Sequence, residues 1–333
     1  MVKEIYQNKS GEVVLSAILP VYNEENLLLQ LKERLISVLE KLNLDYEVIF
    51  VDDASSDNSL KLMQGFNQDN PRIKVLSFAR NFGHQTAITA GLNFSTGKLV
   101  MVLDADLQDP PEIIPRFIEK WKDGYEVVYG VRVRRKDNFI KKLVCNFYYR
   151  ILKELSNVDI PLDSGDCCLM DRKVVDILNM MPERNRFIRG LRRWVGFRQF
   201  GLEYERHRRF AGKSKYTFVK LIKLGLDGII SFSEIPLKVS VLIGFFVSLA
   251  SLLYSIWLVL IRIFNPVNQV PGWTSIVAGI TFLGGIQLIV MGFLGEYIIR
   301  IFDEVKGRPL YVLNCIIGFK NTDAENISNN PGS

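Results

Sequence analysis

The first 130 residues of the chain alternate between short apolar runs and longer amphipathic segments. Each apolar run predicts a buried strand, and the runs are residues 15–22, 46–51, 73–77, 99–103 and 126–129. The segments between them repeat apolar residues at helical spacing, over residues 24–42, 59–66, 84–93 and 113–121. Strands that alternate with helices predict an α/β domain with a mainly parallel, doubly wound sheet.

The pattern changes beyond this region. Residues 138–155 and 216–232 interleave large apolar side chains with lysines and arginines. This mixture is typical of amphipathic helices that lie in the headgroup region of a membrane. Packing of the same helices against the folded domain is the alternative that the pattern leaves open.

Two later runs carry no charged side chain at all, residues 239–261 and residues 274–295. Each is long enough to cross a hydrocarbon core of roughly 30 Å as a helix. The link between them, residues 265–273, has no Lys or Arg, whereas both outer flanks are basic. The positive-inside rule then predicts a multi-pass protein of the inner (plasma) membrane with both termini in the cytoplasm.

These patterns divide the chain into four parts. We expect a cytoplasmic folded domain over residues 1–212 and juxtamembrane amphipathic helices over residues 213–235. A two-helix transmembrane region follows over residues 236–302, and residues 303–333 form a cytoplasmic C-terminal tail whose last part is polar and disordered.

Charge and cysteine content narrow the function. The net charge is +6, and the basic residues cluster just before the predicted spans, so an anionic membrane surface or a bound phosphate explains them better than nucleic acid does. The four cysteines fall in a reducing compartment or beside the membrane, which disfavours a disulfide framework. No P-loop and no G-x-G-x-x-G occurs, so ATPase and dinucleotide-binding functions lose support.

The most informative stretch is residues 100–112, where an apolar run ends in Asp104 and Asp106, followed by Gln108. Alternate residues of an extended chain point the same way, so these three side chains can converge on one point. Three oxygen ligands with open positions suit Mg²⁺ or Mn²⁺ carrying a diphosphate. An ordinary acidic turn after a strand is the alternative.

Acidic pairs also follow the first two predicted strands, at Glu24-Glu25 and at Asp52-Asp53, and the first pair comes just after Tyr22. In an α/β sheet, ligands bind at the carboxyl ends of the strands. An aromatic face, carboxylates for a base and ribose, and a metal for a diphosphate together predict a nucleotide site at that edge.

The order of several motifs adds a resemblance. Pro-Val-Tyr-Asn-Glu-Glu (20–25), Val-Asp-Asp-Ala-Ser (51–55), Arg-Asn-Phe-Gly (80–83), Leu-Asp-Ala-Asp-Leu-Gln-Asp-Pro-Pro-Glu (103–112) and Asp-Ser-Gly-Asp (163–166) follow one another as in family 2 glycosyltransferases. With two C-terminal spans, the chain resembles the polyprenyl-phosphate glycosyltransferases, and most of all the bacterial undecaprenyl-phosphate (bactoprenol) glucosyltransferases. The resemblance covers residues 13–310 and implies a Rossmann-like GT-A fold, a nucleotide-sugar donor, a divalent cation and a lipid-phosphate acceptor.

The resemblance also implies site residues. Those implied for the nucleotide sugar are Pro20, Tyr22, Glu24, Asp52, Asp53 and Asp104; for the metal, Asp104, Asp106 and Gln108; and for the lipid phosphate, Arg132, Arg206, Arg209, Lys213 and Lys215. Arginine suits the last role because it holds phosphate oxygens bidentately. Asp106 and Asp166 are the implied catalytic carboxylates, and we interpret Asp166 as positioning the acceptor or the sugar hydroxyls.

The expected reaction is an inverting transfer of a hexose, most of all glucose from UDP-glucose, to a polyprenyl phosphate at the cytoplasmic membrane face. A phosphate monoester has a second pKa of about 6, so the acceptor is anionic at pH 7 and needs no strong general base. GDP-mannose and UDP-aminoarabinose remain alternative donors. Glycines 284, 285, 292 and 295 in the second predicted span permit close helix contacts and favour a homo-oligomer.

Three other functions are weighed. A processive polysaccharide synthase would carry Gln-x-x-Arg-Trp and more spans, whereas this chain has Arg192-Arg193-Trp194 without the Gln. A non-enzymatic membrane adaptor is disfavoured by the intact Asp-x-Asp. A flippase is disfavoured because neither predicted span holds an ionisable residue.

Overall fold

The computed structural model describes residues 13–133, 164–184, 186–205 and 272–319, with single helical residues between 244 and 260. The chain divides into two compact units. The first holds the sheet with its helices, and the second holds the long C-terminal helix; each is described by itself.

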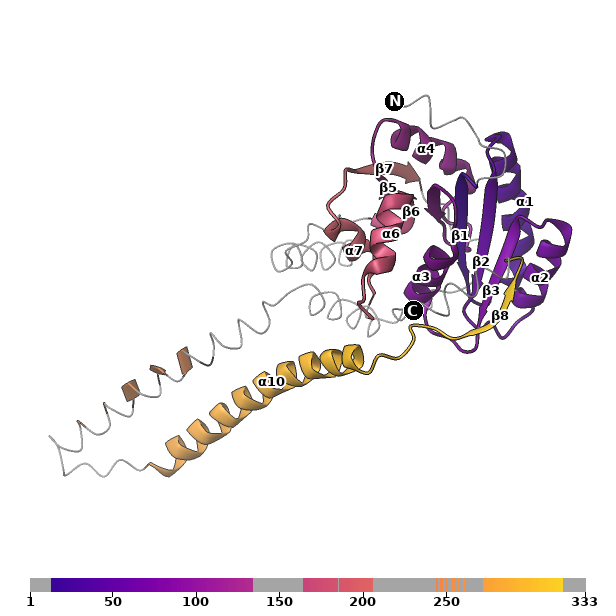
Figure 1. Cartoon of the computed structure of the whole chain (residues 1–333). Coiled ribbons are helices and arrows are strands. Elements are labelled where there is room, and N and C mark those ends of the chain that lie inside the picture. The colour runs from indigo at the N-terminus through magenta and orange to yellow at the C-terminus, as the bar shows by residue number, and fades with distance from the viewer. Residues whose placement is uncertain are drawn as a thin grey trace. The chain divides into compact units, whose positions relative to one another are not determined.

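In the described part of the first unit, eight strands form one sheet in the order β7-β5-β6-β4-β1-β2-β3-β8 (Figure 1). Their bounds are β1 Leu15–Val21, β2 Tyr46–Asp52, β3 Ile73–Phe78, β4 Leu99–Val102, β5 Val127–Val133, β6 Ser164–Asp171, β7 Gln199–Glu205 and β8 Leu313–Ile317. The central strands β4, β1, β2 and β3 are mutually parallel, which confirms the predicted doubly wound core.

Helices cover both faces of this sheet (Figure 1). Their bounds are α1 Glu25–Lys41, α2 Ser59–Asp69, α3 His84–Phe94, the 3₁₀ turn η2 Pro111–Ile113, α4 Ile114–Lys122, α6 Arg172–Met180 and α7 Ile188–Trp194. Helix α1 buries Leu28, Leu31 and Leu35, whose three- and four-residue spacing lines one side of a helix, against the central strands. Helices α2 and α4 contribute to the same core cluster.

Helix α3 packs against the opposite face. A Cβ at Gly91 would lie 2.2 Å from Cγ2 of Ile18 in β1, so only glycine lets the helix approach the strand this closely. The close approach matters for the site because α3 begins at His84, at the carboxyl end of β3.

On one side of the core, a single strand, β6, breaks the parallel pattern. β6 lies antiparallel to both β4 and β5, and β7 adds a parallel edge strand next to β5. The pattern of apolar and polar residues predicts neither β6 and β7 nor helices α6 and α7. The first half of β6, Ser-Gly-Asp, reads as a polar turn, yet Cys167 to Met170 are buried between neighbouring strands.

The chain returns to the sheet at its other edge. β8 pairs antiparallel with β3, and the described residues 308–319 group with the first unit. The predicted C-terminal tail, residues 303–333, therefore contributes a strand, β8, to the sheet. The short run 313–317 alternates between half-buried and exposed residues, so its apolar signal is weak.

The second unit contains α10, Trp273–Val305. Within residues 282–305 of this helix, an 18-residue window has a mean hydropathy of 1.7, and within the described residues α10 alone is long and apolar enough to cross a membrane. The sequence predicts its apolar part as the span 274–295. The other predicted span, 239–261, and the amphipathic stretches 138–155 and 216–232 lie mostly or wholly outside the described residues, so a two-span arrangement is not shown.

Candidate functional site

The carboxyl ends of β1, β2 and β4 form one edge of the sheet. In the register of the parallel pairs, Val21 lies opposite Asp52, and the Asp53 amide donates to the Val21 carbonyl at 2.9 Å. On the other side of β1, the Leu103 amide donates to the Ile18 carbonyl at 3.0 Å. The residues that follow these strands therefore emerge together, as the sequence predicts.

The chain turns sharply just beyond each of these strands. Asn23, Ala54 and Leu107 have φ angles of 56°, 57° and 56°, a left-handed conformation that costs a non-glycine residue roughly 1 kcal/mol or more. One such residue follows β1, one β2 and one β4. The three turns hold the acidic residues at the sheet edge rather than letting the chain run on past it.

Asp52 and Asp53 hold neighbouring loops in place. Asp53 is buried and accepts hydrogen bonds from the amides of Phe82, at 2.7 Å, and Gly83, at 3.0 Å. Burial raises the pKa of Asp53, and the charge of Asp52 adds to that effect. Asp52 accepts from the Ser77 hydroxyl at 2.9 Å. Whether they also bind a nucleoside stays a prediction, but their part in ordering the loops is visible.

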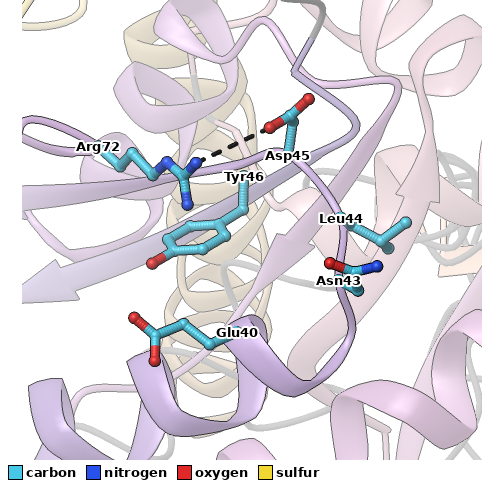
Figure 2. A pocket seen from close by; sticks show the side chains of 6 residues that line it. All are labelled: Glu40, Asn43, Leu44, Asp45, Tyr46 and Arg72. Carbon is cyan, nitrogen blue, oxygen red and sulfur yellow. Dashed lines mark ion pairs between the residues drawn. The ribbon is translucent and has the colours of Figure 1, made fainter. Parts of the chain in front are cut away.

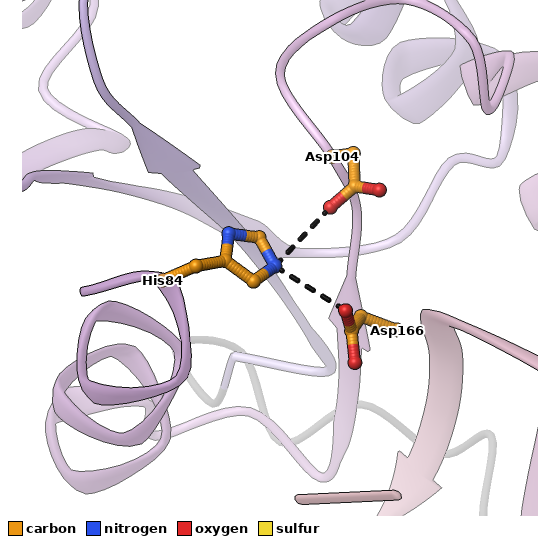
Figure 3. A group of neighbouring side chains, drawn as sticks. All are labelled: His84, Asp104 and Asp166. Carbon is orange, nitrogen blue, oxygen red and sulfur yellow. Dashed lines mark ion pairs between the residues drawn. The ribbon is translucent and has the colours of Figure 1, made fainter. Parts of the chain in front are cut away.

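The centre of the site joins His84, Asp104 and Asp166 (Figure 3). Nε2 of His84 lies 3.5 Å from Oδ1 of Asp104 and 3.4 Å from Oδ2 of Asp166. One ligand atom from each of the three residues lies within 4.8 Å of the others. They come from the start of α3, the end of β4 and the start of β6, so this convergence depends on the antiparallel insertion of β6 beside β4.

The two carboxylates experience different surroundings. Burial raises the pKa of Asp104 to about 6, and the charges of Asp109, Asp166 and Asp106 add to the rise. Burial alone would also raise the pKa of Asp166, but the charge and hydrogen bonds of Arg189 hold it well below its usual range. Arg189 Nε and Nη2 each donate to one Asp166 oxygen at 2.7 Å. Asp166 is therefore held in its ionised form by Arg189. The surroundings of Asp104 instead disfavour its ionised form.

His84 supplies part of that positive charge. Burial acts to lower the pKa of His84, but its hydrogen bond to Asp166 and the charge of Asp104 outweigh that effect and raise the pKa. Its side chain remains 43% exposed, so the ring is the part of the cluster that solvent reaches most easily. The imidazole is placed to offer a ligand nitrogen when neutral or a counter-charge when protonated.

The donor set fits a divalent cation. Carboxylate oxygens suit Mg²⁺ and Mn²⁺ alike, and an imidazole nitrogen is accepted more readily by Mn²⁺. The raised pKa of Asp104 points the same way, since a cation beside this residue would relieve the cost of its ionisation. Arg189 already occupies both oxygens of Asp166, so Asp104 is the better ligand of the two.

The other two residues of the predicted metal set lie in the loop after β4. Asp106 is half-buried, and its Oδ1 accepts from the Gln108 amide at 3.1 Å. Gln108 is 8% exposed. The cluster of three thus contains Asp104 from the predicted set, with His84 and Asp166 in addition, and the roles of Asp106 and Gln108 as ligands stay predictions.

The remaining predicted nucleotide residues lie along the β1 end of the edge. Pro20 is buried within β1, and Tyr22 is 41% exposed just beyond it. Glu24 precedes α1, and its backbone amide donates to the Ser59 hydroxyl at 3.1 Å. An exposed aromatic ring beside the edge is compatible with a stacking role.

Most of the predicted lipid-phosphate residues lie outside the described residues. Arg132 lies in β5, paired in register with Tyr204 of β7. The other four residues, Arg206, Arg209, Lys213 and Lys215, fall outside the described residues.

Sequence reasoning does not assign a role to His84 or Arg189. A signal for His84 exists, because it directly follows the Arg-Asn-Phe-Gly motif and is one of only two histidines in the chain. Arg189 has no such signal. It is one of several arginines around residue 190, and only its place on α7 beside β6 selects it.

A separate hollow of about 350 Å³ lies at the opposite end of β2 (Figure 2). It is lined by Glu40, Asn43, Leu44, Asp45, Tyr46 and Arg72. Arg72 lies 3.9 Å from Asp45 across it. Tyr46 begins β2 and Asp52 ends it, so this hollow is distinct from the acidic edge.

Comparison with known proteins agrees with this geometry. The family described as "Glycosyl transferase family 2" matches residues 16–178, which run from β1 into α6. An uncharacterized glycosyltransferase of Bacillus subtilis, YkcC, is 44% identical over 94% of this chain and 97% of its own. The bactoprenol glucosyl transferase of Shigella phage SfX is 40% identical over 90% of this chain and 98% of its own. A prophage bactoprenol glucosyl transferase homolog of Escherichia coli is 38% identical over 91% and 99%.

These relatives match the chain almost end to end, which confirms the resemblance drawn from the motifs. The mostly parallel core with helices on both faces is the GT-A-like fold that the resemblance implied. The chain belongs to glycosyl transferase family 2, with bactoprenol glucosyl transferases among its relatives.

Proposed function

We propose that this glycosyltransferase moves a hexose, glucose from UDP-glucose, onto a polyprenyl phosphate at the cytoplasmic face of the membrane, with inversion of the anomeric centre. The observation that carries the proposal is the 40% identity over 90% of the chain to a bactoprenol glucosyl transferase. That similarity extends well beyond the family match at residues 16–178, so it includes the region that would meet the lipid.

The acidic edge is suited to the donor. We assign Asp52, Asp53 and Glu24 to the nucleoside side, with the exposed Tyr22 ring beside them. Asp104, Asp106 and Gln108 would hold Mg²⁺ or Mn²⁺, with His84 next to them. When bound, the cation would supply the positive charge that stabilises a departing diphosphate.

Asp166 is suited to positioning rather than to proton transfer. A general base works best when its pKa lies near the working pH, and Arg189 holds the pKa of Asp166 far below that. The acceptor phosphate is anionic at pH 7, its second pKa being about 6, and needs no strong base in order to attack. Asp166 would then accept hydrogen bonds from sugar hydroxyls or orient the acceptor through Arg189, whose guanidinium suits a phosphate.

The membrane arrangement belongs to the same proposal. α10 would anchor the enzyme in the inner membrane, and residues 239–261 would form a second span with both termini cytoplasmic. Arg132, Arg206, Arg209, Lys213 and Lys215 would hold the lipid phosphate. In the same arrangement, the glycines of the spans would allow close helix contacts in a homo-oligomer.

The decisive experiment incubates purified full-length protein with undecaprenyl phosphate and a panel of labelled nucleotide sugars: UDP-glucose, GDP-mannose and UDP-aminoarabinose. Each reaction is run with Mg²⁺, with Mn²⁺ and with chelator. Label in the lipid phase from UDP-glucose, lost with chelator, is the expected result. Label from another donor would replace the sugar assignment, and label only in a water-soluble polymer would favour a synthase.

The substitution Asp106→Asn is the matched negative control. It keeps the size of the side chain and removes its charge, so we expect the variant to melt like the wild type and to transfer no sugar. Normal turnover by a folded Asp106→Asn enzyme would remove Asp106 from the metal site.

A further inference from the structure

The segment that follows α10 contacts the chain just before the loop that precedes His84. β8 extends the sheet beside β3, and beyond that ladder the Ala79 amide donates to the Val312 carbonyl at 2.9 Å. This pairing reaches the last residue before the loop Arg80–Gly83. An edge strand left open would expose unpaired backbone groups there, and β8 covers them.

Tyr311 makes the closest connection. It is 8% exposed, and its ring stacks on Phe78 at the end of β3, with ring centroids 5.3 Å apart and an interplanar angle of 17°. Its hydroxyl accepts a hydrogen bond from Nδ2 of Asn93 at 3.0 Å. Asn93 lies in the last turn of α3, the helix whose first residue is His84. Tyr311 therefore ties the end of β3 to the far end of that helix.

The contacts continue from Phe78 to the site. Phe78 meets Phe82 edge to face, with centroids 5.6 Å apart. The Phe82 and Gly83 amides donate to Asp53, and His84 follows in the chain. Aromatic pairs of this kind are stabilising beyond the area that they bury, so they favour one conformation of the loop over others.

A second line of contacts runs through β8 itself. Cys315 pairs opposite Ser77, and the Ser77 hydroxyl donates to Asp52 at 2.9 Å. The same segment thus lies beside Ser77, which donates to Asp52, and beside the residue before the loop whose amides donate to Asp53. Neither contact involves a charged group of the C-terminal segment, so any influence on the site is exerted by packing and hydrogen bonding.

We infer that Tyr311 is a positioning residue for the donor site, which is completed by the chain that returns from α10. Its stack on Phe78 holds Phe82, and thereby the amides that orient Asp53 and the turn that places His84. The inference rests on the proposed function for its kinetic consequence, but its structural part stands independently. Only residues 306–310 separate the end of α10, a candidate membrane helix, from Tyr311 in the chain.

The test compares full-length wild type with Tyr311→Ala, Tyr311→Phe and Asn93→Ala. Val312→Ala is the matched control, because Val312 is adjacent in the segment and its side chain is 51% exposed. Hydrogen exchange is followed in peptides covering residues 79–86 and, as an internal reference, residues 27–39 of α1. In Tyr311→Ala, exchange in the loop should rise about tenfold, with α1 unchanged, because only local opening becomes easier.

Kinetics give the second readout. Tyr311→Ala should raise KM for the nucleotide sugar roughly fivefold and leave KM for the lipid phosphate unchanged. Tyr311→Phe keeps the stack and should show a smaller rise, similar to that of Asn93→Ala, which loses the same hydrogen bond. Val312→Ala should match the wild type in both measurements.

Unchanged exchange in residues 79–86 of Tyr311→Ala, or faster exchange there and in α1 alike, would overturn the inference. If Tyr311→Ala does not fold, the same comparison is made with Tyr311→Phe and Asn93→Ala. A wild type that transfers no sugar would overturn the proposed function alone, because the exchange experiment does not depend on turnover.

Discussion

Asp104 is a residue whose ionised form is disfavoured by its surroundings in the folded protein. Its pKa of about 6 in the folded protein exceeds the ordinary 3.8, so the folded state binds this proton more tightly than the unfolded state does. The stability that Asp104 contributes is present below pH 4 and is lost as the pH rises through 6. Its full loss amounts to about 3 kcal/mol at most.

The substitution Asp104→Asn should therefore stabilise the metal-free protein at pH 8 relative to wild type, and the gain should shrink at pH 5. Thermal melting of both proteins in detergent with chelator, across this range, measures the difference. Added Mn²⁺ should raise the melting temperature of the wild type and not that of the variant. If the melting temperatures of the two proteins changed in parallel with pH, burial would not raise the pKa of Asp104.

Asp166 and Arg189 form a second test at this scale. Removing the guanidinium with Arg189→Met leaves a carboxylate whose side chain is 9% exposed without its main counter-charge. We expect a loss of about 3 kcal/mol in stability, seen as a lower melting temperature.

The double variant Arg189→Met with Asp166→Asn is the control for that result. Because it removes the buried charge as well, it should recover most of the lost stability. A double variant as unstable as Arg189→Met would show that Arg189 acts through packing instead.

Among the elements, the loop from β3 to α3 depends on one backbone conformation. Gly83 has a φ of +98°, and a Cβ placed there would meet nothing within 4 Å. Any effect of Gly83→Ala therefore comes from backbone strain alone, about 1–2 kcal/mol, and not from a clash. We expect a lower melting temperature and a higher KM for the nucleotide sugar, because the Gly83 amide binds Asp53.

Gly65→Ala is the matched control for this substitution. Gly65 lies within α2, also with nothing within 4 Å of an added Cβ, but without a positive φ. Alanine there should raise stability by about 0.5–1 kcal/mol, because it favours the helix. The opposite signs of the two changes would separate loop strain from a general effect of added methyl groups.

For the whole molecule, the proposed role of α10 is to anchor the protein in the membrane. Leu288 lies inside the candidate span 282–305 and is 71% exposed in the described part of the chain. A charge at the centre of a membrane span costs roughly 2.5–3.5 kcal/mol, whereas one near the end costs much less. Leu288→Arg should therefore lower the membrane fraction in flotation assays, and Val305→Arg at the helix end should not.

Equal membrane fractions for Leu288→Arg and Val305→Arg would mean that α10 is not inserted. Lipid-dependent transfer would then require a different anchor, such as the basic amphipathic stretches 138–155 and 216–232. The comparison thus tests the anchoring role of α10 separately from the chemistry of the acidic edge.

The sequence by itself determined the parallel core and the edge that bears the acids. The spacing of Leu28, Leu31 and Leu35 predicts α1, and the apolar run before Asp104 predicts β4, each within a residue or so of its observed bounds. These features are local, because helical and extended periodicity are written in residues a few positions apart. Asp52, Asp53 and Asp104 were found for the same reason, as polar residues that follow buried strands.

Only the tertiary structure decided which residues meet at that edge. Asp166 reaches His84 and Asp104 because β6 inserts antiparallel beside β4, and Arg189 reaches Asp166 because α7 packs next to β6. Tyr311 joins the site's framework because β8 returns to β3 after α10. Pairing between distant strands is fixed by the burial and hydrogen bonding of the whole sheet, and no local pattern in residues 164–171 or 313–317 specifies the neighbour that each strand will find.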